Sequence, residues 1–258
     1  MMLRRTVTIA LLFVTGTRTA AAQGHSQDRG RKGERGKGDE QGSRGGQGEH
    51  AATVPPHAAT VPPVEQRQRV KIQQQRAAEY RRQLDQQVIA MQQQNVQLQQ
   101  QRRMSQYGAQ QQYAAQLRQQ QRDLLAARDY ATDPWVSAPY TYRYVANGAN
   151  RQTNQYGAEV LRQAVRNGYA QGYRAGQADQ QDHSPASYQS TFAYRDANHG
   201  YAGRDVDQSD YNFYFRQGLE RGYADGFTHR AQYGTVAKGA TTIHSALLST
   251  ILGFQPIR

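Results

Sequence analysis

Apolar residues recur at seven-residue intervals through a long stretch rich in glutamine and arginine, residues 65–128. Both residue types favour helices and the stretch contains no proline, so the spacing predicts a long helix with one apolar stripe. We expect a break or bend at Gly108, where the stripe has lapsed. Two interpretations remain open: a self-associating coiled coil, which would make the protein a homo-oligomer through residues 65–128, or a solvated helix. The stripe comprises Val70, Ala77, Leu84, Met91 and Leu98, with Tyr80 and Val88 beside it.

A second pattern occurs twice, fifty residues apart, and it is an internal repeat with glycine at every fourth position. Residues four apart lie one turn up and about 40° around a helix, so each glycine set forms a groove beside a ridge of large residues. This arrangement indicates helix packing rather than a reacting site. The groove residues are Gly168, Gly172 and Gly176 in the first copy and Gly218, Gly222 and Gly226 in the second; the ridge residues are Tyr169, Tyr173, Phe215 and Tyr223.

The two glycine-rich segments predict two helices, at roughly 155–181 and 211–230. Asn154 is a good N-cap residue before the first helix, and Ser209 or Asp210 before the second. A glycine in mid-helix costs about 1 kcal/mol relative to alanine, which close approach of two backbones can offset. We therefore predict that the helices pack on each other about a pseudo-two-fold axis, the aromatic ridge of one filling the groove of the other. The alternative is that each groove receives a helix from another subunit.

The repeats lie in a duplicated module, residues 129–235. Its first part, residues 129–153, combines the only tryptophan with several tyrosines and predicts an irregular loop that packs on the rest of the module. Each repeat unit, at about 140–182 and 192–230, is expected to be an irregular lead-in followed by a helix.

The two ends of the chain have different patterns. Residues 1–22 have a basic start, a short apolar run and an alanine-rich cleavage site, which predicts a secretory signal peptide. Residues 23–64 are of low complexity, first glycine- and arginine-rich and then proline-rich, and predict a disordered linker. The tail, residues 236–258, predicts a short amphipathic helix capped by Thr241 or Thr242.

These elements predict a mainly α protein that is exported. The sequence contains no cysteine, which excludes lipid attachment through a cysteine at the cleavage site. No long apolar segment follows the signal peptide, so we expect no membrane span. The protein is therefore expected to be periplasmic or secreted, with a cleaved signal peptide, and not a lipoprotein.

The net charge of +12 is concentrated in residues 65–128, which hold eleven basic and four acidic residues. A basic surface attracts polyanions, so this helix could bind an anionic envelope polymer such as lipopolysaccharide, acidic polysaccharide or extracellular DNA. A solvated basic helix is the simpler alternative. No specific nucleic-acid motif is present. The candidate polyanion contacts are Arg67, Arg69, Lys71, Arg76, Arg81, Arg82, Arg102 and Arg103.

The sequence shows no catalytic, cofactor or metal motif. The run from Asp205 to Asp210 begins like a calcium loop, but glycine is missing at its sixth position and Arg216 stands where a bidentate glutamate is needed. The seven histidines are scattered, without ligand spacing. No phosphate loop, serine-nucleophile elbow or paired-carboxylate motif occurs. We therefore expect no enzyme activity, no cofactor and no metal.

Residues 129–258 resemble a group of uncharacterised secreted proteins of soil bacteria, of the acidobacterial type. The resemblance implies an exported protein with a duplicated helical module, and it implies no activity or ligand. The leading expectation is thus a non-enzymatic structural or interaction protein of the bacterial envelope or exterior. The resemblance is carried by Asn154-Gln155-Tyr156-Gly157, by Gly168-Tyr169 and Gly172-Tyr173, by Phe215-Arg216, Gly218, Gly222-Tyr223 and Gly226, and by Ile251-Leu252-Gly253-Phe254-Gln255-Pro256.

Overall fold

The computed structural model describes residues 60–126, 128–237 and 239–257. The signal peptide and nearly all of the linker predicted for residues 23–64 lie outside the described residues. The described chain is mainly helical with small sheets, as the sequence predicts. No helix in it is long and apolar enough to span a bilayer.

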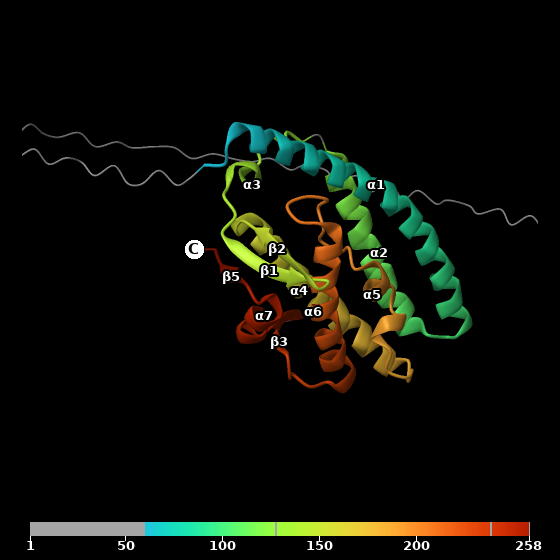
Figure 1. Ribbon diagram of the computed structural model, residues 1–258. Coiled ribbons are helices and arrows are strands. Elements are labelled where there is room, and N and C mark those ends of the chain that lie inside the picture. The colour runs from blue at the N-terminus through green and yellow to red at the C-terminus, as the bar shows by residue number, and fades with distance from the viewer. Residues whose placement is uncertain (1–59, 127, 238, 258) are drawn as a thin grey trace, which may run out of the picture. The chain divides into compact units, whose positions relative to one another are not determined.

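The glutamine-rich stretch forms a helical hairpin instead of one long helix. Helix α1 spans Pro63–Gln100 and helix α2 spans Met104–Leu125, and α2 folds back along α1 (Figure 1). The chain turns at Gln101–Arg103, where Arg102 adopts a positive φ of 58°. The break expected at Gly108 is therefore wrong, because that glycine lies inside α2.

The apolar stripe of α1 is buried within the chain. Ala77, Leu84, Met91 and Leu98 are all buried, and so is the neighbouring Tyr80. Tyr80, Leu84 and Met91 belong to the same core cluster as residues of α2 and of the duplicated module. Helix α1 therefore packs its stripe inside its own chain. Val61, which we placed in the linker, is also buried.

The lead-in to the first glycine-rich helix is a β-hairpin, not the irregular loop that we predicted. After the short helix α3 (Pro134–Ser137), strand β1 (Tyr142–Ala146) pairs antiparallel with β2 (Ala149–Thr153). The turn is Asn147-Gly148, and both residues have positive φ (52° and 76°), as a tight type I′ hairpin requires. Strand β5 (Gln255–Pro256) adds to the other side of β1, giving the order β2-β1-β5.

The first glycine-rich helix, α4, spans Gln155–Gln181, which are the predicted bounds. Its N-cap is also confirmed, because Asn154 Oδ1 accepts hydrogen bonds from the backbone N–H groups of Tyr156 and Gly157, both at 3.1 Å. Between the repeats lie a 3-10 turn (Tyr188–Ser190) and the short helix α5 (Phe192–Asp196).

The second glycine-rich helix, α6, spans Gln208–Thr228 and so begins before the predicted caps. Asp207 occupies the N-cap position and makes no side-chain capping bond. The predicted caps Ser209 and Asp210 instead lie in the first turn, where Asp210 is buried. The helix ends at Thr228, and the C-cap residue His229 has a positive φ of 53°.

The tail also contains strands that the sequence did not predict. Strands β3 (Gly234–Ala237) and β4 (Ala240–Ile243) form a hairpin, and helix α7 spans Ser245–Leu252. Thr241 and Thr242, which we predicted to cap this helix, lie in β4, and His244 occupies the N-cap position. Helix α7 covers the module: Leu248 and Leu252 are buried in its core.

Candidate functional site

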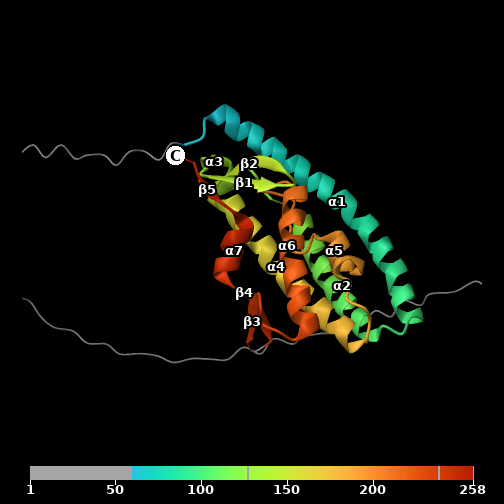
Figure 2. The same ribbon diagram turned by 60° about the horizontal axis from the view of Figure 1, so that its bottom comes forward.

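The six groove glycines lie in the interface between α4 and α6, which are side by side in Figures 1 and 2. Each glycine lies directly against a backbone carbonyl of the other helix. A Cβ at any of the six would lie well inside the 3.0 Å that real Cβ atoms keep from such an oxygen. Gly168, Gly172 and Gly176 face the carbonyls of Phe215, Leu219 and Tyr223, and Gly218, Gly222 and Gly226 face those of Val165, Tyr169 and Tyr173.

These contacts have the symmetry of the repeat. Gly168 contacts Phe215 of the second copy, and Gly218, the repeat equivalent of Gly168, contacts Val165, the repeat equivalent of Phe215. The partner numbers rise together along both helices, so α4 and α6 run parallel, related by a pseudo-two-fold axis along their length. The groove is occupied by backbone carbonyls, and not by the aromatic side chains that we expected. Such Cα–H···O contacts recur where helix backbones approach closely.

The ridge tyrosines reach buried aspartates across the interface. Tyr169 donates a hydrogen bond to Asp225 Oδ2 (2.7 Å), and Tyr223 donates one to Asp179 Oδ2 (2.6 Å). Burial and these hydrogen bonds raise the pKa of both phenols above its usual value. Tyr173 is only half-buried. Tyr169 and Tyr223 remain protonated at neutral pH and serve as hydrogen-bond donors that hold the two helices together.

The C-terminal end of α4 also binds the tip of the α1–α2 hairpin, where α2 begins. The Asp182 carboxylate accepts hydrogen bonds from the backbone N–H groups of Ser105 (2.9 Å) and Gln106 (2.8 Å), in the first turn of α2. Arg103 donates to Asp179 Oδ1 at 2.5 Å. A carboxylate at this position satisfies N–H groups that have no partner within their own helix. Helix α2 is thus capped by a residue that directly follows α4.

The aspartates of the calcium-like run hold the opposite end of the hairpin. Gln73 donates to Asp205 Oδ1 and accepts from the backbone N–H of Asp205, both at 2.8 Å. Arg76 forms an ion pair with Asp207 at 2.5 Å. Within the described residues, no group of three or more histidine and acidic side chains is placed to hold a metal ion.

Three of the eight predicted polyanion contacts are used inside the protein. Arg69 is 3 % exposed, donates to the Ala138 carbonyl at 2.7 Å, and lies 4.1 Å from the ring centroid of Tyr140. Arg69 is buried, which contradicts its predicted role as a polyanion contact. Arg76 and Arg103 are partly exposed, and their guanidinium groups are already paired with the carboxylates of Asp207 and Asp179. The exposed members of the set are Arg67, Lys71, Arg81, Arg82 and Arg102.

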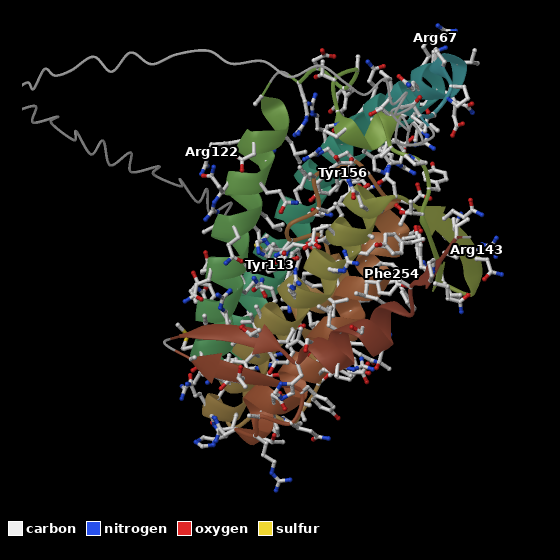
Figure 3. The ribbon with its side chains drawn as sticks, turned by 90° about the vertical axis from the view of Figure 1, so that its left-hand side faces the viewer. Arg67, Tyr113, Arg122, Arg143, Tyr156 and Phe254 are labelled. Carbon is white, nitrogen blue, oxygen red and sulfur yellow. The ribbon has the colours of Figure 1, made fainter. Side chains whose placement is uncertain are left out.

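The exposed arginines gather where the N-terminal half of α1 meets the C-terminal half of α2. Arg81 donates to the carbonyl of Leu124, near the end of α2, which brings the two segments together. Arg82 is exposed beside it, and Arg118 and Arg122 are exposed one turn apart on α2. Figure 3 shows Arg122 on the outer side of α2. We refer to Arg81, Arg82, Arg118 and Arg122 as the basic surface. The four-residue spacing of its α2 members is a sequence signal that our candidate set did not include.

A cavity of about 380 Å³ lies on the other side of α2, against the segment 199–202. The Gln120 side chain fixes this segment: its Nε2 donates to the Tyr201 carbonyl (2.6 Å) and its Oε1 accepts from the Gly200 N–H (2.7 Å). Burial, with the nearby charge of Arg174, lowers the pKa of His199 in the cavity wall to about 4. The imidazole is therefore neutral at pH 7, and among the described residues no carboxylate is hydrogen-bonded to it. Asp123 also lines the cavity, and its Oδ1 accepts a hydrogen bond from Gln119 at 3.0 Å.

Comparison with known proteins finds no matching family model, no matching curated protein and no matching solved structure. The chemistry of these surfaces is therefore the basis for assigning a function.

Proposed function

We propose that this is an exported, non-enzymatic interaction protein of the bacterial envelope or exterior, and that its helical hairpin binds anionic polymers. The polymers would be lipopolysaccharide, acidic polysaccharide or extracellular DNA. The predicted signal peptide and the resemblance to secreted proteins of soil bacteria support export. The internal pairing of the tyrosines and aspartates in the module supports a structural rather than a catalytic role for them.

The observation that carries the binding proposal is the basic surface. Two antiparallel helices present four exposed arginines on neighbouring turns, after three other basic residues have been used to build the fold. A polymer with regularly spaced anions can contact several of these guanidinium groups at once. Its affinity would come largely from released counterions and would fall steeply with salt.

The buried stripe of α1 supports a single-chain hairpin over the self-associating coiled coil. A coiled coil through residues 65–128 would need Leu84 and Met91 at its interface, and both are buried within the chain. We therefore propose that the exported chain is monomeric. Light scattering on a sizing column tests this: a defined oligomer that is lost when residues 65–128 are deleted would restore the coiled-coil interpretation.

The binding test compares two double substitutions of equal charge in the full chain without its signal peptide. Arg118→Gln/Arg122→Gln removes half of the basic surface, whereas Arg166→Gln/Arg230→Gln removes two exposed arginines elsewhere. Affinity for lipopolysaccharide, a uronic-acid polysaccharide and duplex DNA is measured over a range of salt. For DNA, we expect the first variant to lower the slope of log affinity against log salt by about 2, and the control to leave it nearly unchanged. Equal losses in the two variants would show that net charge, not this surface, governs binding.

A further inference from the structure

The outer face of the small sheet carries a row of polar side chains set by strand register. Arg143 of β1 is paired with Gln152 of β2 on one side and with Gln255 of β5 on the other. Two residues further along the same face, Val145 is paired with Asn150. Paired residues on one face of an antiparallel sheet have Cβ atoms about 4.5–5.5 Å apart, so the Arg143 side chain leaves the sheet between those of Gln152 and Gln255.

This row faces away from the core. Tyr144 and Ala146 are the buried residues of β1, and they alternate with the exposed Arg143 and Val145, the latter 54 % exposed. Figure 3 shows Arg143 on the outer side of the sheet, and Arg122 of the hairpin on the other side of the view. The row is therefore separate from the basic surface.

None of these four polar side chains is used by the fold. Within the described residues, Arg143, Asn150, Gln152 and Gln255 make no side-chain hydrogen bond or ion pair. The three amides each offer two N–H donors and one carbonyl acceptor, and the guanidinium offers five donors. They line a hollow of about 400 Å³ whose walls contain no carboxylate. The remaining wall residues are Tyr144, Val145, Arg151 and Gly253.

The nearest buried acid does not neutralise this row. Asp210 lies against the inner face of the sheet, where it accepts a hydrogen bond from the Tyr144 hydroxyl at 2.8 Å and lies 3.6 Å from Arg151 Nε. Arg151 is paired with Tyr144, the inward-facing position of β1. The charge of Arg143 on the outer face is therefore left for a ligand.

We propose that this face binds one acidic sugar unit of a carboxylated polysaccharide. The guanidinium of Arg143 would take the carboxylate through two parallel hydrogen bonds, and the flanking amides of Gln152 and Gln255 would take ring hydroxyls on either side. The exposed Val145 offers an apolar contact for the sugar ring. An amide can both donate a hydrogen bond to a sugar hydroxyl and accept one from it. A phosphodiester oxygen can only accept a hydrogen bond, so it would leave the amide carbonyls without a partner. This chemistry favours an acidic polysaccharide over DNA. The inference goes beyond the hairpin function and does not depend on it.

The test uses a short galacturonic-acid oligosaccharide and its fully methyl-esterified form, with binding to the full exported chain followed by calorimetry. Three variants are compared: Arg143→Gln, Arg143→Lys and, as a control, Arg230→Gln, which removes an exposed arginine outside both proposed surfaces. Arg143 is exposed, so its variants are expected to melt at the wild-type temperature. We expect about tenfold weaker binding for Arg143→Gln, and an intermediate loss for Arg143→Lys, which keeps the charge without the planar fork. The Arg230→Gln control should bind the oligosaccharide like wild type.

Any one of four results would overturn the inference. The first is absence of binding to the wild-type chain, and the second is wild-type binding by Arg143→Gln. The others are equal binding of the esterified sugar and an oligonucleotide that binds through Arg143 as tightly as the uronic-acid chain. The oligosaccharide assay tests the sheet face through Arg143, and the salt dependence tests the basic surface through Arg118 and Arg122. The two proposals can therefore fail independently.

Discussion

The α4–α6 pair and the α1–α2 hairpin are both built from packed helices, but the contacts that hold them differ in kind. Between α4 and α6, glycine meets backbone carbonyl over three successive turns, with no side chain in between. The hairpin is attached by side chains. Its apolar stripe packs in the same core cluster as the module, and aspartates bind it through Asp179 and Asp182 at one end and Asp205 and Asp207 at the other.

This difference shows how the two regions can respond to change. A backbone contact cannot move to make room for an added atom, whereas a side chain can adopt another rotamer or bind water. The α4–α6 pair should therefore tolerate almost no substitution at its glycines. The hairpin should tolerate the loss of single contacts and should separate from the module before the module itself unfolds.

The largest effect is expected at the glycines. Gly172→Leu or Gly222→Leu places a side chain against the carbonyl of Leu219 or Tyr169, and should destabilise the fold by about 3 kcal/mol or more. Even Gly172→Ala should lower the melting temperature. The matched control is Gly108→Ala, in α2, where nothing lies within 4 Å of the added Cβ. That change should raise stability by up to about 1 kcal/mol. Similar melting temperatures for the two alanine variants would contradict the backbone contact.

A smaller effect is expected at Asp179, which joins both regions. Asp179→Ala leaves Arg103 and the Tyr223 hydroxyl without their partner, and should cost about 2–4 kcal/mol. Hydrogen exchange should increase first at the N-terminus of α2. The control is Glu159→Ala, which breaks exposed ion pairs with Arg162 and Arg166 worth at most about 1 kcal/mol. A loss confined to α4 and α6, with α2 still protected, would argue against separate attachment of the hairpin.

His199 should make the hairpin side of the protein sensitive to acid. The pKa of its imidazole is about 4 in the folded chain and about 6.5 when unfolded, so the folded state disfavours the charged form. Its contribution to stability is full above pH 6.5 and is lost as the pH falls toward 4. Burial raises the pKa of Asp196 and Asp205, so these carboxyls act in the opposite direction at low pH.

The contribution of His199 can be isolated by substitution. Melting temperatures are measured at pH 7 and pH 4.5 for wild type and His199→Gln. The variant should lose less stability than wild type over this interval, because it has no buried group to protonate, while the aspartates contribute equally to both. A larger loss in the variant would reverse the assigned direction of the histidine pKa.

The α4–α6 arrangement could be predicted because its signal is local and repeated. Glycine at every fourth position, with Asn154 before it, predicts both the bounds of α4 and the pairing of the two helices. The direction of the hairpin could not be predicted in the same way. The seven-residue stripe of α1 indicates that one face is apolar, but it does not say whether that face meets another chain, α2 or the module. The destinations of Arg69 and Arg103 depend on partners more than sixty residues away.

Two other local signals are present in the sequence and point to the observed elements. Asn147-Gly148 between alternating tyrosines and polar residues is a hairpin signal, because tyrosine is itself common in strands, and the irregular loop that we predicted overlooks it. Asp207 lies two residues before the predicted cap of α6, and several residues of the run from 205 to 210 can cap a helix equally well. The polar sheet face could not be predicted from the sequence, because Gln152 and Gln255 are brought beside Arg143 only by the pairing of strands, one of which lies more than a hundred residues away.

The smallest predicted effect compares the N-termini of the two repeats. Asn154 is fully buried and caps α4, and its Nδ2 also donates to the Trp135 carbonyl at 2.9 Å. Asn154→Ala should therefore cost about 1–2 kcal/mol in chemical denaturation. Asp207→Ala, at the equivalent position of α6, removes no capping bond and only a partly exposed ion pair with Arg76, so its cost should stay below about 1 kcal/mol. Equal losses in the free energy of unfolding for the two variants would contradict this difference. They would mean that Asp207 caps α6 in solution as Asn154 caps α4.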